Sequence, residues 1–174
     1  SQFADVGLLD LMTASLKGLV SRFGLENAVM KKVALGAVIT PSRIWNFSRD
    51  AVVRSGLSLQ SPAVTMGRAC GTSLEAAALI AAKIASGQIQ VGIAGGADSM
   101  SDIPLTFKKT LARRILRTSR ARDLSGRLTP WLGLWPTEFL PDAPAITESK
   151  TGLSMGEHCE LMAQQWNISR SEQD

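Results

Sequence analysis

Two segments of the chain show the hydrophobic periodicity of amphipathic helices. Between positions 4 and 23, apolar residues stand mostly at helical spacing and Gly24 follows as a typical helix end. A shorter helix is predicted for 47–55, with charged residues on its outer face and Gly56 as its end. The apolar residues of the first helix are Val6, Leu8, Leu9, Leu11, Met12, Leu16, Leu19 and Val20.

Three other segments have the pattern of buried strands. Residues 33–39 form a continuous apolar run, and residues 62–66 form a second run that ends at Gly67. In a third segment Ile89, Val91 and Ile93 alternate with small residues, and we expect Gly95 and Gly96 to end that strand. Residues 27–32 and 42–46 are predicted to be loops.

A helix rich in small residues is predicted for 74–86, with Gly87 as its end. It contains six alanines and only two charged residues, Glu75 and Lys83. A helix of this composition can approach its neighbours on nearly every side, so we expect it to be buried. Helices thus alternate with strands along the first hundred residues, which predicts an α/β fold with a mostly parallel sheet covered by helices.

Composition and length limit the class of protein. The 174 residues, 45% of them apolar, suffice for an ordinary domain with its own core. Two cysteines at this size indicate a reducing compartment rather than a disulfide framework. We expect no secretory signal and no membrane span, because no apolar run reaches about 18 residues. His158 is the single histidine, so chemistry that needs two imidazoles is excluded within this chain.

Cys70 is the first candidate for chemistry. It precedes the small-residue helix, where unpaired backbone N–H groups and the helix dipole favour an anion and hence a nucleophilic thiolate. The alternative from position alone is a small buried hydrophobic residue chosen for packing.

The region after position 104 is basic and then apolar. Residues 108–127 contain one acidic residue, Asp123, and eight basic ones: Lys108, Lys109, Arg113, Arg114, Arg117, Arg120, Arg122 and Arg127. Leu111, Ile115 and Leu116 suit a helix whose opposite face is basic, and Trp131 and Trp135 follow among prolines. Three interpretations remain open: a solvated helix, a site for coenzyme A phosphates, and a surface that contacts a membrane or a partner protein. Without a recognition motif, nucleic-acid binding is not expected.

The stretch GRACGTSLEAAALIAAKIASG, with VGIAGGADSMS after it, resembles the nucleophile region of thiolases. The motifs RAC-x-TS, AGGADS and MGEHCE resemble segments of the thiolase β subunits of fatty-acid oxidation (trifunctional) complexes. The resemblance implies an acyl-CoA acyltransferase of fatty-acid β-oxidation, in which Cys70 accepts the acyl group as a thioester. It also implies that the backbone N–H of Cys70 is an oxyanion donor.

The resemblance covers only the first half of a thiolase. It implies residues 1–103 as an N-terminal α/β domain whose opening strand is missing, and 104–174 as part of a helical and irregular loop domain. The family's catalytic histidine, second cysteine and second oxyanion donor belong to the absent half, so we expect this chain alone to be inactive. Coenzyme A and acyl-CoA are implied as substrates, and neither a tightly bound cofactor nor a metal is expected.

The resemblance also bears on the basic region. The loop domain of thiolases covers the coenzyme A tunnel, and in the complex-forming type it is implicated in membrane association. We therefore expect Arg113, Arg114, Arg117, Arg120, Trp131 and Trp135 to contact a membrane surface or coenzyme A. A homodimer or tetramer is expected, with an α subunit of a β-oxidation complex as a further partner.

Near the end of the chain, Met155 is a candidate for lining the acyl site. Ser154 stands where many biosynthetic thiolases have histidine, which is in keeping with a degradative enzyme. We expect His158 to lie on a surface or line a helix rather than act as the base for Cys70, and Cys159 to be a packing residue. Leu153, Leu161, Met162 and Trp166 are expected in a core or a substrate tunnel.

Two other functions stay open. A 3-ketoacyl-synthase-like condensing enzyme would also use a cysteine at a buried helix start, although AGGADS and MGEHCE favour a thiolase. A truncated homologue without activity could serve as a dimerisation, membrane-docking or partner-docking module. The location expected for an enzyme of this type is the cytoplasm in bacteria or the mitochondrion in eukaryotes.

Overall fold

The structure is a computed structural model that describes residues 3–142 and 145–174. The chain divides into two compact units, Ser1–Pro104 and Leu105–Asp174. The sequence placed a domain boundary between residues 103 and 104. Each unit is described by itself below.

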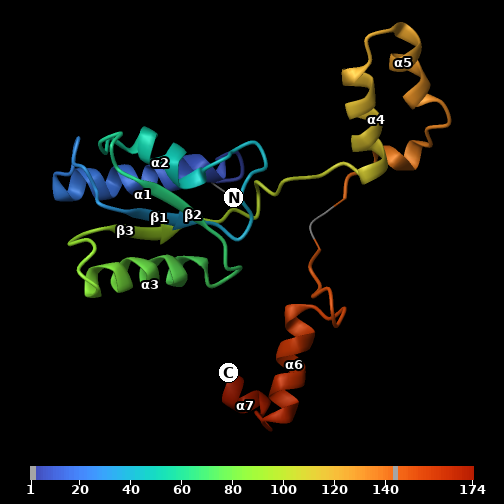
Figure 1. Ribbon diagram of the computed structural model, residues 1–174. Coiled ribbons are helices and arrows are strands. Elements are labelled where there is room, and N and C mark those ends of the chain that lie inside the picture. Colours follow the sequence, from blue (N-terminus) through green and yellow to red (C-terminus); the bar gives the residue numbers. More distant parts are fainter. Residues whose placement is uncertain (1–2, 143–144) are drawn as a thin grey trace. The chain divides into compact units, whose positions relative to one another are not determined.

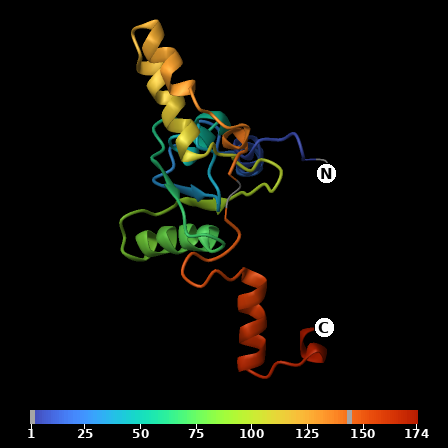
Figure 2. The same cartoon turned by 90° about the vertical axis from the view of Figure 1, so that its right-hand side faces the viewer.

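Unit 1 is a parallel sheet with helices on both faces. Its elements are α1 (Leu8–Phe23), β1 (Val33–Gly36), α2 (Phe47–Ser55), β2 (Ala63–Met66), α3 (Thr72–Ala85) and β3 (Ile93–Gly96). The strand order among the described residues is β2-β1-β3, and both strand pairs are parallel. Helices α1 and α2 cover one face and α3 covers the other (Figures 1 and 2). The predicted α/β fold with a parallel sheet is confirmed.

The central strand β1 separates two hydrophobic clusters because successive side chains point to opposite faces. Val33 and Leu35 belong to the larger cluster with α1 and α2, whereas Ala34 packs with Ala76 and Ile80 of α3. All four residues of β1 are buried. This explains why the strand reads as a continuous apolar run rather than an alternating one.

Helices α1 and α2 end at the glycines that the sequence indicated. Gly24 and Gly56 both adopt left-handed backbone angles after α1 and α2. The predicted start of α1 at position 4 was wrong, because the helix begins at Leu8. There the carboxylate of Asp102 accepts the backbone N–H of Leu8 at 2.9 Å, so a residue distant in sequence sets the first turn.

Two strands have other limits than the pattern predicted. β1 ends at Gly36 instead of position 39, since the N–H of Val38 donates to Asp98 Oδ1 at 2.7 Å. β3 begins at Ile93 and includes Gly95 and Gly96, which we expected to end it. These glycines pair with β1 in register, so here glycine permits a close approach of backbones.

Helix α3 is less buried than its composition suggested. It begins at Thr72 and buries one face through Thr72, Ala76 and Ile80. Leu74, on the other side, is 77% exposed. The prediction that α3 is buried on nearly every side is therefore wrong for the described chain.

Unit 2 consists of short helices with little core. Its elements are α4 (Lys109–Arg120), α5 (Leu124–Leu128), η1 (Thr129–Trp131), η2 (Pro136–Phe139), α6 (Met155–Gln165) and α7 (Arg170–Gln173). Among its described residues, the one buried hydrophobic side chain is Leu111. Capping boxes begin α6, through Ser154 and Glu157, and α7, through Ser169 and Glu172. Short helices of this kind depend on their caps because packing contributes little.

The expected core role of the α6 region is not observed. Met155, Leu161, Met162 and Trp166 are each between 46% and 64% exposed. None of the described helices combines the length and hydropathy that crossing a bilayer requires.

Candidate functional site

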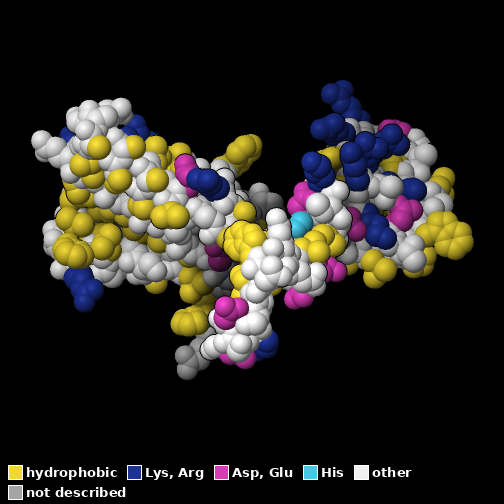
Figure 3. Space-filling view, turned by 90° about the horizontal axis from the view of Figure 1, so that it is seen from below, with side chains coloured by type: hydrophobic (Ala, Val, Ile, Leu, Met, Phe, Trp, Pro, Cys, Tyr) yellow, Lys and Arg dark blue, Asp and Glu magenta, His cyan; other side chains and the backbone are white. Residues whose placement is uncertain are grey.

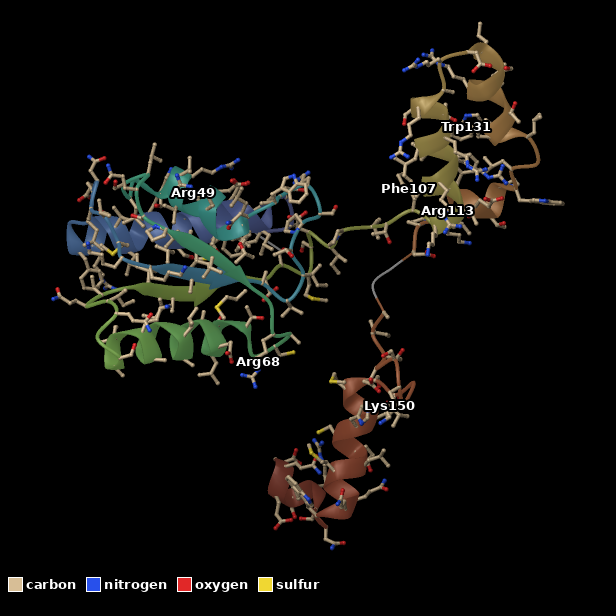
Figure 4. All side chains as sticks on the ribbon, viewed as in Figure 1. Arg49, Arg68, Phe107, Arg113, Trp131 and Lys150 are labelled. Carbon is tan, nitrogen blue, oxygen red and sulfur yellow. The ribbon has the colours of Figure 1, made fainter. Side chains whose placement is uncertain are left out.

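Cys70 lies in the turn that joins β2 to α3, at the carboxyl end of a parallel strand. It stands just before Gly71, the residue that precedes the first turn of α3, and its side chain is exposed. Arg68 of the same turn lies beside the N-terminal end of α3 (Figure 4). The position predicted from sequence, a thiol at the start of a helix, agrees with this placement.

The turn is tight and is held by its own hydrogen bonds. Ala69 has a φ of +43°, which residues with a side chain rarely adopt. The N–H of Gly71 donates to Arg68 O at 3.0 Å, and the N–H of Thr72 donates to Ala69 O at 3.2 Å. These bonds bring Cys70 to the open end of α3.

The hydroxyl of Thr72 closes the same turn a second time. Thr72 Oγ1 accepts the N–H of Arg68 and donates to Ala69 O, both at 2.7 Å. Thr72 is only 3% exposed, so neither bond competes with bulk water. The sequence analysis did not predict this role of Thr72, because the left-handed angle of Ala69 gives no signal in the sequence.

Beneath the turn, two strand-end glycines allow α3 to approach the sheet. A Cβ on Gly36 would lie 2.4 Å from Thr72 Cγ2 and 2.2 Å from the carbonyl oxygen of Met66. A Cβ on Gly96 would lie 2.4 Å from Ser73 Oγ. Any larger residue at either position would push the start of α3, and Cys70 with it, away from the strands.

Side chains from two loops link the carboxyl ends of the strands. Asp98, after β3, accepts from Val38, after β1. Asn46 caps α2 by accepting the N–H of Arg49 at 3.0 Å, and its Oδ1 also accepts the hydroxyl of Thr65 of β2 at 2.8 Å. The loops around Cys70 are thereby tied to the sheet.

Arg68 and Glu75 form an ion pair along the first turn of α3. The side chains are 70% and 37% exposed, so water and salt screen their attraction. We therefore assign this pair a role in orienting Arg68 rather than in stability.

In unit 2 the predicted basic residues gather on α4. A cavity of about 550 Å³ opens between α4 and the residues after it, and Arg113, Arg114 and Arg117 line it. Figure 3 shows Lys and Arg side chains concentrated over this part of the unit. Leu111 is buried, but Leu116 is 51% exposed, so the predicted apolar face of α4 is only partly covered.

The four predicted arginines of α4 are not equivalent. Arg114 donates to Pro130 O at 2.6 Å and to Leu132 O at 3.1 Å, and it pairs with Glu138 at 3.5 Å. Within the described residues, Arg113, Arg117 and Arg120 take part in no ion pair. Arg114 thus holds the fold of the segment, whereas the other three present charge to a ligand or to solvent.

The predicted tryptophans lie on the surface of the same unit. Trp131 belongs to η1 and is 37% exposed, and Trp135, just before η2, is 72% exposed. Figure 4 labels Trp131 together with Arg113 in this unit. Both kinds of side chain, basic and indole, are therefore available to solvent.

The remaining candidates lie in or next to α6. Met155 is its first residue and is 63% exposed. The Nε2 atom of His158 lies 2.9 Å from Thr151 Oγ1, so its recorded partner is a local hydroxyl. Cys159 is exposed, which corrects the expectation of a packing residue. Across residues 3–142 and 145–174 no cluster of three metal-ligating side chains occurs.

Comparisons with known proteins agree with this arrangement. Residues 1–174 match the family described as "Thiolase, N-terminal domain". The chain is 37% identical over 172 residues to a 3-ketoacyl-CoA thiolase of Klebsiella pneumoniae (strain 342), covering 99% of this chain and 39% of that protein. It is 40% identical over 156 residues to a 3-ketoacyl-CoA thiolase of Pectobacterium atrosepticum, covering 90% of this chain and 36% of that protein.

A third relative aligns with the whole of this chain. The 3-ketoacyl-CoA thiolase of Photorhabdus laumondii is 37% identical over 174 residues, which are 100% of this chain and 40% of that protein. The chain therefore spans about two fifths of the length of the curated relatives it matches.

Proposed function

Because the chain belongs to the thiolase family, through that family's N-terminal domain, we propose that the protein is an acyl-CoA acyltransferase. Cys70 is its nucleophile. The observation that carries the proposal is the exposed thiol of Cys70 in a tight turn before α3, within a sequence similar to 3-ketoacyl-CoA thiolases.

The proposed reaction has two acyl transfers. In the first, the thiol proton of Cys70 passes to a base, and Sγ forms a bond to the 3-keto carbon of a 3-ketoacyl-CoA as the bond between that carbon and C2 breaks. The leaving group departs as acetyl-CoA after C2 takes up a proton. In the second, the thiol of coenzyme A gives its proton to a base and its sulfur bonds to the acyl carbon. The bond from that carbon to Sγ breaks, and the Cys70 thiolate regains a proton. A covalent intermediate of this kind divides one difficult step into two easier ones.

The developing oxyanion requires a preorganised donor. The backbone N–H groups of Gly71 and Thr72 already donate within the turn, so we assign this role to the N–H of Cys70. The base is assigned to sequence beyond the thiolase N-terminal domain. His158 already lies beside the hydroxyl of Thr151 and is not proposed for that role.

The names of the relatives favour a 3-ketoacyl-CoA substrate. We propose in addition a role in fatty-acid breakdown, which the resemblance to the β subunits of oxidation complexes implies. We propose coenzyme A thioesters as the substrates, no tightly bound cofactor, and a homo-oligomer that joins an α subunit. Met155 is proposed to line the acyl site. The 174 residues alone are proposed to be inactive, because they carry a nucleophile without the rest of the machinery.

The test compares two cysteine variants in the natural full-length protein. Thiolysis of a 3-ketoacyl-CoA should fall to background in Cys70→Ser and persist in Cys159→Ser, since both cysteines are exposed and one only is assigned to chemistry. Full activity in Cys70→Ser would disprove the assignment.

A second candidate function is peripheral contact with an anionic membrane surface. Arg113, Arg117 and Arg120 lie outside the ion pairs of the described chain, with Leu116 exposed among them. Trp135 supplies an exposed indole of the kind that enters the headgroup region. Contact with coenzyme A phosphates is the competing role for the same arginines.

Vesicle sedimentation separates the two roles. With anionic phospholipid vesicles, the protein should sediment, and the triple Arg→Gln variant at positions 113, 117 and 120 should not. Neutral vesicles should bind neither protein. If excess free coenzyme A releases the protein from vesicles, the arginines serve coenzyme A and the membrane proposal fails.

A further inference from the structure

The turn that carries Cys70 contains a buried hydroxyl whose contacts are all to backbone. Thr72 Oγ1 accepts the N–H of Arg68 and donates to the carbonyl of Ala69, each at 2.7 Å. Both partners precede Cys70 in the turn. Thr72 is only 3% exposed.

Ala69 is the strained residue of this turn. Its φ of +43° lies in the left-handed region, which alanine adopts at a cost of roughly 1 kcal/mol or more. Such a conformation persists when the surroundings over-determine it. Here the Thr72 hydroxyl bonds the peptide group before the Arg68 Cα and the peptide group after the Ala69 Cα. The two bonds therefore span Arg68 and Ala69, and relaxation of the φ of Ala69 would strain or break one of them.

The methyl group of Thr72 is fixed as firmly as its hydroxyl. A Cβ on Gly36 would meet Thr72 Cγ2 at 2.4 Å, so this methyl occupies the space that glycine leaves at the end of β1. The hydroxyl is therefore aimed by contact of the methyl with the central strand. Sheet, Thr72 and the Ala69 turn form one continuous support for Cys70.

We propose that Thr72 is a positioning residue for Cys70: its hydroxyl holds Ala69 in the left-handed conformation that presents the thiol at the open end of α3. This inference rests on the proposed function for its catalytic consequence. The structural part of the inference, that Thr72 orients Cys70, does not depend on the proposed function. Without the hydroxyl, Ala69 relaxes and Cys70 is displaced from its place before α3.

The test uses the natural full-length protein and two substitutions that separate hydroxyl from shape. Thr72→Val keeps the branched side chain beside Gly36 but removes both hydrogen bonds, and Thr72→Ser keeps the hydroxyl. The matched control is Thr13→Val, since Thr13 is also buried and its hydroxyl has no hydrogen-bond partner in the described chain.

The first readout is the single-turnover rate of Cys70 acylation. We expect Thr72→Val to lower this rate about ten- to a hundredfold with little change in KM, because a displaced nucleophile loses orientation rather than substrate binding. Thr13→Val should retain a rate near wild type. Thr72→Ser should lie between wild type and Thr72→Val, because it keeps the hydroxyl but loses the methyl group that aims it. Adding Ala69→Gly to Thr72→Val should restore part of the rate, because glycine adopts a positive φ without strain.

The second readout does not require thiolase activity. Alkylation of Cys70 by iodoacetamide, followed by mass spectrometry with Cys159 of the same molecule as reference, should be about tenfold slower in Thr72→Val. If wild type forms no acyl adduct but this difference appears, the proposed function fails and the positioning role stands. If Thr72→Val acylates and alkylates at wild-type rates, or if Ala69→Gly restores nothing, the positioning role is overturned.

Discussion

Substitution of Gly36 by alanine should destabilise unit 1 severely. Gly36 ends the fully buried central strand, and an added Cβ would lie 2.2 Å from the carbonyl oxygen of Met66 and 2.4 Å from Thr72 Cγ2. One of these neighbours is the backbone of a paired strand and the other is the anchored side chain of α3. Neither can retreat without disturbing the sheet.

The expected cost follows from overpacking of a well-packed core. Such an insertion costs about 1–3 kcal/mol, and this site belongs at the upper end because a backbone atom is in the way. With a urea dependence of about 1–3 kcal/mol per molar, the unfolding midpoint should fall by roughly 1–2 M. Circular dichroism of the chain during urea titration measures this midpoint.

Gly18→Ala is the matched control. Gly18 lies inside α1, and a Cβ there would meet nothing within 4 Å. The same substitution should stabilise the chain by about 0.5–1 kcal/mol, because alanine favours a helix interior over glycine. If Gly36→Ala and Gly18→Ala shift the midpoint in the same direction by similar amounts, the argument from close packing is refuted.

Three further predictions concern contacts outside the turn. Asp102→Ala should lower the free energy of unfolding by about 0.5–2 kcal/mol, because it removes the acceptor for the N–H of Leu8, and a urea titration measures this loss. The backbone N–H and then the hydroxyl of Ser154 hold the pKa of Glu157 below its ordinary 4.5, so the cap of α6 contributes stability above that value and loses it as pH falls. By circular dichroism, the loss of helicity between about pH 5 and pH 3 should be smaller in Glu157→Gln than in wild type, while Glu172 at the start of α7 titrates in both proteins. Arg114→Gln should expose the residues after α5 to protease, while Arg113→Gln should not, because only the former arginine donates to their carbonyl groups.

Much of unit 1 follows from local patterns. The bounds predicted for α2 agree with the structure because local signals set both ends, Asn46 as the cap and Gly56 as the left-handed stop. The buried strand at Val33 was equally readable from its apolar run. In each case residues within a few positions determine the outcome.

The errors arise where distant residues decide. Helix α1 begins at Leu8 because Asp102 accepts its N–H, and no local pattern contains that information. Gly95 and Gly96 continue β3 because α3 and β1 press against the strand, whereas glycine in isolation suggests a break. Tertiary packing overrides the local preference in both cases.

The candidate site was likewise predicted in part. The sequence pointed to Cys70 through its place before a helix and through resemblance. The support given by Thr72 was not predicted, because it depends on the positive φ of Ala69 and on the space left by Gly36. The exposure of Cys159 was not predicted either, since a lone cysteine without a partner is most simply interpreted as a packing residue.

The central claim is that Cys70 accepts an acyl group, and the intact mass of the full-length protein after incubation with an acyl-CoA tests it most directly. The account predicts a single acyl adduct, with the modified peptide containing Cys70, and its removal by free coenzyme A. An adduct on Cys159, or a stable adduct that coenzyme A does not remove, would contradict the account.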